Sequence, residues 1–144
     1  MKLSTRSRYG MRAVLDLARN YGNGPLQIKA IAQNEDISNK YLEQLISILK
    51  SAGMVRSLRG PRGGYMLVNH PSEVTLGDVF RVLEGPFVPV ECIGDSGYCG
   101  RYSDCLMREV WVKLQKSIDD VLDAITMQDL VEKYGDGENV DFHI

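Results

Sequence analysis

The fold is decided by residues 37–65, which read ISNKYLEQLISILKSAGMVRSLRGPRGGY. Ser38 stands at the N-cap position of an expected helix that ends at residues 51–53, and apolar residues recur between them at helical spacing. These residues are Leu42, Leu45, Ile46 and Leu49. Two short strands, residues 54–58 and 65–68, are predicted around the basic, glycine-rich turn between them. Such a hairpin directly after a helix is typical of a wing, and an exposed turn that happens to be charged is the alternative.

The residues before this stretch predict two more helices. The first carries an apolar stripe and is stopped by residues 22–25, Gly-Asn-Gly-Pro, and a short second helix follows. The first stripe consists of Met11, Val14, Leu15, Ala18 and Tyr21, and the second of Ile28, Ile31 and Ala32. Two short helices joined by a tight connection, the second capped by serine, match the helix-turn-helix plan. We therefore predict a winged helix-turn-helix DNA-binding domain over residues 1–70.

A helix and a loop are predicted after the hairpin. Thr75 begins the helix, with Asp78 three residues later as in a capping box, and Gly85-Pro86 ends it. Residues 86–104 have few periodic apolar positions and are expected to form a loop.

A long amphipathic helix is predicted next, with Ser103 or Asp104 as its N-cap. Its apolar stripe consists of Leu106, Val110, Leu114, Ile118, Val121, Leu122 and Ile125. An isolated long helix must bury such a stripe, which favours packing against a second copy of the chain; burial on its own domain is the alternative. A short helix and a polar tail from Gly135 complete residues 71–144, the expected loop and dimerisation region. The expected fold class is mostly α with a small β-wing.

The composition is that of an ordinary folded protein, but the charge is unevenly divided. The chain has 144 residues, of which 44% are hydrophobic, and no apolar run suits a membrane span or a signal peptide, so a cytoplasmic protein is expected. Residues 1–70 hold eleven Lys and Arg against four Asp and Glu, and residues 71–144 hold six against fifteen. The balances of +7 and −9 sum to the net charge of −2. A basic half joined to an acidic half favours a polyanionic partner for the first.

The start of the third helix exposes side chains of the kinds that read DNA. They are Ser38, Asn39, Lys40, Tyr41, Glu43 and Gln44. Amides bond adenine, carboxylates accept from cytosine and Lys reaches guanine or phosphate, and a plain surface role for Glu43 is the alternative. Arg59, beside Arg62 on the wing, suits a narrow minor groove. Arg6 and Arg8 suit phosphate contacts that set the register. The predicted partner is a double-stranded DNA operator.

The three cysteines, Cys92, Cys99 and Cys105, have the spacing C-x6-C-x5-C. An odd number of clustered cysteines argues against a disulfide scaffold. Structural zinc sites use closer pairs, so an iron–sulfur cluster wrapped by a glycine-rich loop is favoured. Zinc binding, thiol redox sensing and incidental cysteines are the alternatives. Such a cluster usually takes four ligands, so the fourth must come from elsewhere.

Four motifs resemble one family of winged-helix transcription regulators, which includes the IscR, NsrR and CymR types. The motifs are residues 1–12 (MKLSTRSRYGMR), 41–45 (YLEQL) after Ser38, 58–65 (LRGPRGGY) and 83–86 (LEGP). The resemblance covers nearly the whole chain. It implies a homodimer in which the long C-terminal helix crosses its partner, the second helix of the motif enters the major groove and the wing enters the minor groove. It also implies that the three cysteines hold an iron–sulfur cluster, with [2Fe-2S] favoured over [4Fe-4S].

Departures from the cluster-binding types leave the fourth ligand unassigned. The IscR type has one residue fewer between the first two cysteines, and its fourth ligand is a His at the position of Arg108. The NsrR type uses an Asp of the partner chain at the position of Arg8. Arginine stays protonated in proteins and cannot ligate. The candidates are Asp104, Glu91, Glu109, a small thiol and water.

Residues 84–89 (EGPFVP) and 138–144 (ENVDFHI) resemble the CymR type in particular, which lacks the cysteine trio and acts with an O-acetylserine thiol-lyase. The predicted function is a homodimeric repressor that senses through a cluster and is linked to iron–sulfur or cysteine homeostasis. The cluster is expected to order residues 90–106 beside the DNA-binding half. The alternative is a cluster-free repressor controlled by a partner protein or by thiol oxidation. The sequence shows no nucleophile–base pair, P-loop or paired-carboxylate signature, so an enzyme is not predicted.

Overall fold

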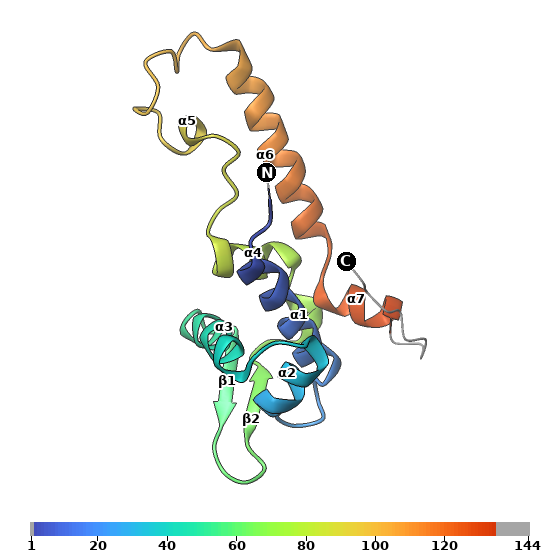
Figure 1. Cartoon of the computed structure of the whole chain (residues 1–144). Coiled ribbons are helices and arrows are strands. Elements are labelled where there is room, and N and C mark those ends of the chain that lie inside the picture. Colours follow the sequence, from blue (N-terminus) through green and yellow to red (C-terminus); the bar gives the residue numbers. More distant parts are fainter. Residues whose placement is uncertain (1, 135–144) are drawn as a thin grey trace.

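The computed structural model describes residues 2–134 as a mostly helical chain with one two-stranded sheet (Figure 1). The helices are α1 (Thr5–Arg19), α2 (Ile28–Glu35), α3 (Asn39–Ser51), α4 (Leu76–Glu84), α5 (Glu91–Gly94), α6 (Leu106–Ala124) and α7 (Met127–Tyr134), with a 3-10 turn at Pro71–Glu73. The strands are β1 (Val55–Leu58) and β2 (Gly64–Leu67). The predicted tail from Gly135, including residues 138–144, lies outside the described residues. None of the described helices is long and apolar enough to cross a membrane.

The predicted winged helix-turn-helix is confirmed. Helices α2 and α3 follow each other through a short connection, and β1 pairs antiparallel with β2 in the register from Val55↔Leu67 to Leu58↔Gly64. Leu26, before α2, adds one bridge to the hairpin, because its N–H donates to the Tyr65 carbonyl at 2.8 Å. The sheet is therefore tied to the helices at its base, and only its turn projects.

Helix α1 lies at the centre of the core. It packs against α2, α3, α4, α7 and β2, so both halves of the sequence contribute to one apolar interior. The fully buried members include Val14, Ile31, Leu42, Leu49, Val79 and Met127. Gly10 lets α4 approach α1 closely, because a Cβ at this position would overlap the Leu83 side chain.

The predicted helix starts at Ser38 and Thr75 are confirmed by hydrogen bonds. Ser38 Oγ accepts from the Tyr41 N–H at 3.1 Å. Thr75 and Asp78 form a complete capping box, in which each side chain accepts from the other residue's N–H at 3.0 Å. Each cap satisfies N–H groups that a helix leaves unpaired at its first turn.

The predicted start of α6 at Ser103 or Asp104 is wrong, because Cys105 is the N-cap and makes no side-chain capping bond. Tight turns occupy the chain up to this point: the Tyr102 N–H donates to the Cys99 carbonyl, and the Asp104 N–H to the Arg101 carbonyl, both at 3.1 Å. The helix begins only where these turns end. The expected loop at 86–104 also contains the one-turn helix α5.

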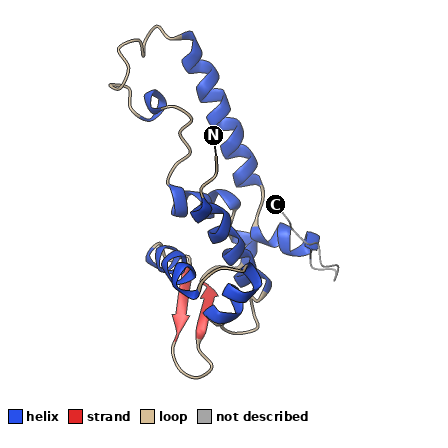
Figure 2. Cartoon of the chain, viewed as in Figure 1, coloured by secondary structure: helices blue, strands red, loops and turns tan. Residues whose placement is uncertain are grey.

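Helix α6 extends away from this body. Figure 2 shows the hairpin and the long connection before α6 at opposite ends of the molecule. None of the 19 residues of α6 is buried. Its exposed apolar side chains include Leu106, Met107, Val110, Val112, Leu114 and Val121, with Leu106 86% and Val121 60% exposed. Within residues 2–134 of one chain, the stripe therefore stays largely open.

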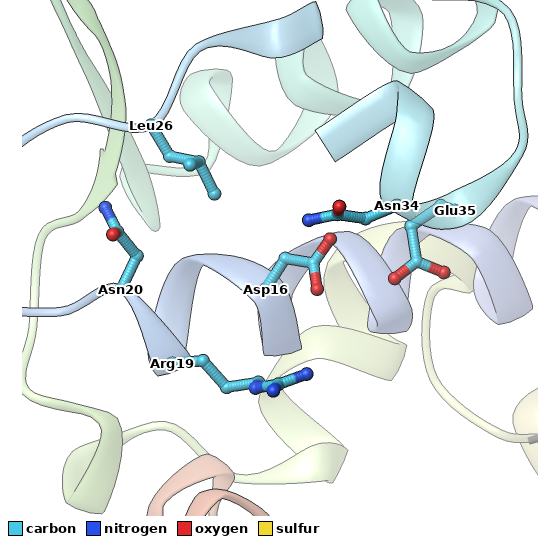
Figure 3. A pocket seen from close by; sticks show the side chains of 6 residues that line it. All are labelled: Asp16, Arg19, Asn20, Leu26, Asn34 and Glu35. Carbon is cyan, nitrogen blue, oxygen red and sulfur yellow. The ribbon is translucent and has the colours of Figure 1, made fainter. Parts of the chain in front are cut away.

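Two acidic side chains, Asp16 of α1 and Glu35 of α2, are buried side by side where the two helices pack (Figure 3). Asp16 Oδ2 has no hydrogen-bond partner, and Arg12 forms an ion pair with Glu35. The pair lines a groove of about 550 Å³ with Arg19 and Asn34 among its other walls. Burial and then the charge of Glu35 raise the pKa of Asp16 to about 7. Between about pH 4 and pH 7 the Asp16 carboxyl therefore stays protonated more often in the folded protein than in the unfolded chain.

Asp16→Asn is expected to stabilise the protein more at about pH 8 than at about pH 5. The pKa of Asp16 rises on folding from 3.8 to about 7. The protonated Asp16 carboxyl is therefore tolerated in the folded wild type at low pH, and this advantage is lost as the pH rises through that interval. Above it, the buried and ionised carboxylate opposes folding. The Tm of the variant minus that of the wild type should grow by several degrees between the two pH values in thermal unfolding. Asp36→Asn, at an exposed neighbouring carboxylate, is the control and should show no such growth. A Tm difference between Asp16→Asn and the wild type that does not change with pH would contradict the raised pKa of Asp16.

Candidate DNA interface and cysteine loop

Helix α3 presents one polar face to solvent. Its opposite face is fixed in the core by four buried residues, Leu42, Leu45, Ile46 and Leu49. Of the predicted DNA-contacting residues, Ser38, Asn39, Lys40, Glu43 and Gln44 are exposed. Tyr41 is partly buried and packs edge-on against Tyr9 of α1, with 6.1 Å between ring centroids. The start of α3 is therefore a rigid platform whose free side chains can reach base edges in a major groove.

Two residues that the sequence analysis did not single out lie on the same face. Ser47 and Lys50 are exposed and stand four and seven residues after Glu43. Helical spacing places such positions on one face, so extending the pattern two turns beyond Gln44 would have found them. Glu43 is the only carboxylate on α3. Near DNA a carboxylate is repelled by the phosphates unless it accepts a hydrogen bond from a base, such as the amino group of cytosine.

The wing carries two of its three arginines at its tip, and the third, Arg56, lies on β1. Arg59 and Arg62 are exposed in the turn between β1 and β2. Gly60 has φ +112°, a conformation that favours glycine, and the Gly63 N–H closes the turn on the Gly60 carbonyl at 2.9 Å. A Cβ on Gly63 would overlap the Leu58 carbonyl, so the tight turn needs glycine there as well. The two arginines thus project from a narrow loop suited to a groove.

Arg6 and Arg8 are exposed on the first turns of α1, at the end that lies beside α4 (Figure 1). Arg6 Nη1 lies 3.5 Å from the Leu83 carbonyl, and the Ser7 hydroxyl donates to Glu84 at 2.6 Å, which fixes this end of α1 against α4. The structure groups the α3 residues with one another, but it does not bring Arg6 and Arg8 to the wing.

The three cysteines are not brought together. Cys92 lies on α5, Cys99 in the turns after it and Cys105 at the N-cap of α6, and all three are free thiols that are partly buried. In residues 2–134 no three or more His, Cys, Asp or Glu side chains form a group that could hold a metal ion. Thiolates are the ligands that iron–sulfur clusters use. The donor chemistry fits such a cluster, but the arrangement of this segment does not.

The segment before α6 is anchored to α6 and α4. Gln115 Nε2 donates to the Phe87 carbonyl at 2.7 Å, and the Phe87 ring packs 6.4 Å from that of Phe80. Arg108 lies over the Tyr102 ring at 4.2 Å, an attractive cation–π geometry. The segment lies at the far end of the molecule from the wing (Figure 1), and the ordering of residues 90–106 by a cluster beside the DNA-binding half stays a prediction.

Comparison with known proteins agrees with this fold. The Rrf2 family, described as "Iron-dependent Transcriptional regulator", matches residues 3–133. The transcriptional regulator CymR of Bacillus subtilis is 44% identical over 138 residues, which are 96% of this chain and 94% of that protein.

Two solved structures of similar proteins superpose on nearly the whole chain. CymR, the global cysteine regulator of B. subtilis, has a TM-score of 0.80 and 42% identity over 92% of this chain and 98% of that one. IscR of T. potens has a TM-score of 0.77 and 40% identity over 92% of this chain and 88% of that one. The chain therefore belongs to the Rrf2 family of winged-helix transcriptional regulators.

Proposed function

We propose that this chain is a homodimeric, sequence-specific repressor that binds a double-stranded DNA operator in the cytoplasm. The observation that carries the proposal is that α3 exposes one polar face while its opposite face is buried in the core. A wing with two arginines at its tip follows this helix directly. Such a helix fits the major groove and such a wing an adjacent minor groove. Residues 1–70 read the DNA in this proposal, and residues 71–144 carry dimerisation and regulation.

Base readout and phosphate contact are divided among the exposed residues. Asn39, Glu43 and Gln44 have the acceptor and amide groups that distinguish base pairs. Lys40 suits guanine or phosphate, while Ser38 and Tyr41 suit phosphate. The remaining candidates supply positive charge: Arg59 and Arg62 from the wing, and Arg6 and Arg8 from α1. The affinity for DNA then depends on all of these contacts, whereas the choice of DNA sequence depends on the α3 residues.

The homodimer rests on α6. A 19-residue amphipathic helix with no buried side chain gains little stability alone, and exposed apolar patches of this kind mark interaction sites. A second copy of α6 is the occupant that supplies a complementary apolar stripe, and two-fold symmetry is common among operator-binding proteins.

The regulation we propose is an iron–sulfur cluster held by Cys92, Cys99 and Cys105, of the [2Fe-2S] type in preference to [4Fe-4S]. Its support is the donor set of three partly exposed thiols in one segment, together with a family described as iron-dependent. The segment would have to close to bring the thiols together, and Gly94, Gly97 and Gly100 have the backbone freedom for this.

A cluster-free mode of control is the second candidate, and the separation of the three thiols favours it. The similarity to CymR, the global cysteine regulator, points in the same direction. In this mode thiol oxidation or a partner protein such as an O-acetylserine thiol-lyase sets the affinity for DNA. A link to sulfur or iron–sulfur homeostasis is common to both candidates.

Glu43→Gln is expected to change the preferred base at one operator position, with a loss of about 1–3 kcal/mol in discrimination, because the carboxylate acceptor is replaced. Arg59→Ala is expected instead to weaken binding to all sequences and to reduce the salt slope by about 1. Dissociation constants for a selected operator and its single-base variants over a salt series measure both effects. Glu73→Gln, at an exposed carboxylate outside α3 and the wing, is the control. A loss for Glu43→Gln that is equal on every sequence would argue against base readout.

Val121→Glu is expected to convert the dimer to a monomer. This side chain is 60% exposed in the single chain, so a charge is tolerated there, but it would be buried unpaired between two copies of α6. Light scattering after size exclusion gives the mass directly. Lys116→Ala, at an exposed polar position of the same helix, should remain dimeric. A dimeric Val121→Glu protein would place the interface elsewhere.

Protein purified without oxygen is expected to be brown and to contain iron and acid-labile sulfide, all of which are lost when Cys92, Cys99 and Cys105 are changed together to alanine. Loss of the cluster should change operator affinity about 5–150-fold, the range of ordinary allosteric coupling. Absorption spectra, iron and sulfide assays and operator titrations test this, with Ser96→Ala in the same segment as the control. A colourless, iron-free protein whose binding does not respond to the triple variant would leave the cluster-free candidate.

A further inference from the structure

The joint between α6 and the winged helix-turn-helix is small and well defined. The chain runs from α6 directly into α7, which packs in the core, and the backbone pairs with the segment before α4 at the same point. The Leu76 N–H donates to the Ile125 carbonyl at 2.9 Å, and the Met127 N–H to the Val74 carbonyl at 2.8 Å. These bonds fix where α6 is attached, but they leave its direction to side-chain contacts.

Arg81 of α4 supplies ionic contacts of this kind. Its Nη2 lies 2.5 Å from Asp123 Oδ1, and its Nη1 lies 3.8 Å from Asp119 Oδ1, so one guanidinium reaches two successive turns of α6. Asp78, three residues earlier on α4, lies 3.7 Å from the same Nη2 and is a third carboxylate partner of the guanidinium. Because guanidinium is planar and always charged, its orientation relative to two carboxylates fixes a direction as well as a distance.

Gly77 makes the same joint sterically tight. It is buried at the start of α4, and a Cβ there would overlap the Asp123 carboxylate and lie 2.8 Å from Arg81 Nη2. A close approach of α4 to the Asp123 side chain of α6 thus coincides with the ion-pair network. Exposed ion pairs contribute little to stability, so a network built here has geometry as its main consequence.

We propose that Arg81 is a positioning residue that sets the angle between α6 and the DNA-binding domain, and thereby the half-site spacing that the dimer accepts. The inference rests on the proposed DNA-binding dimer. Two recognition helices joined through α6 must match two half-sites, and each added base pair shifts a half-site by about 3.4 Å and rotates it by about 34° around the DNA axis. A 19-residue helix is about 28 Å long, so a change of about 7° at its end moves the far domain by a comparable distance.

The test compares spacing profiles. A half-site selected by the wild-type protein from random duplexes is placed as an inverted repeat with its spacer varied by single base pairs, and as an isolated half-site. For the wild type we expect about tenfold weaker binding one base pair away from the best spacing, as each extra mismatch typically costs. For Arg81→Ala we expect that ratio to fall to about threefold or less, with isolated half-site binding and Tm nearly unchanged.

Gly77→Ala gives an independent perturbation of the same joint. It keeps every charge and favours the helix, yet its methyl group displaces the Asp123 carboxylate, so it should broaden the profile like Arg81→Ala. Lys116→Ala is the matched control, because it removes the Lys116–Asp120 ion pair within α6, 2.7 Å long, which does not reach α4. It should keep the wild-type profile.

Retention of the wild-type profile by both Arg81→Ala and Gly77→Ala would overturn the inference while leaving the proposed function intact. A wild-type protein that is monomeric, or that selects no repeated half-site, would overturn the proposed function and this inference with it. An equal loss on all spacings and on the isolated half-site would show a merely structural role for Arg81 and would also overturn the inference.

Discussion

The close contact between α1 and α4 is the constraint on which the arrangement depends. Gly10 has no side chain where Leu83 of α4 packs, which costs about 1 kcal/mol in helix propensity but lets the two helices meet without a gap. With α4 held in this way, its capping box orients its first turn. Arg81 and Gly77 of α4 then contact Asp123 of α6. One helix thus connects the DNA-reading elements to the proposed dimer helix.

This connection matters because the two chemically distinctive parts of the chain are far apart. The basic wing and the cysteine segment lie at opposite ends of the molecule (Figure 2). Phe87 links the cysteine segment to both α4 and α6, through its ring and its carbonyl. Within one chain, α4 and α6 are therefore the elements through which the cysteine segment contacts the body that carries α3.

The features that the sequence predicted are those whose causes are local. Ser38 and Thr75 cap helices through bonds three residues away, and the apolar spacing in α3 is visible in the sequence itself. The start of α6 was mispredicted because it depends on turns that end at Asp104, and no spacing pattern reports them. The Arg81–Asp123 pair joins residues 42 positions apart, and the proximity of Asp16 and Glu35 likewise depends on tertiary packing. The exposed face of α3 that is proposed to read DNA could be predicted from the apolar spacing, whereas the placement of the cysteines could not.

The exposed α6 has a consequence for the amount of protein in a cell. In the proposed dimer, the apolar stripe of α6 is covered only when two chains meet, so part of the free energy of folding comes from association. The stability of such a chain rises with its own concentration, and dilute chains are the ones exposed to proteolysis. Abundance would then act on DNA occupancy twice, through the number of molecules and through the fraction that is properly assembled.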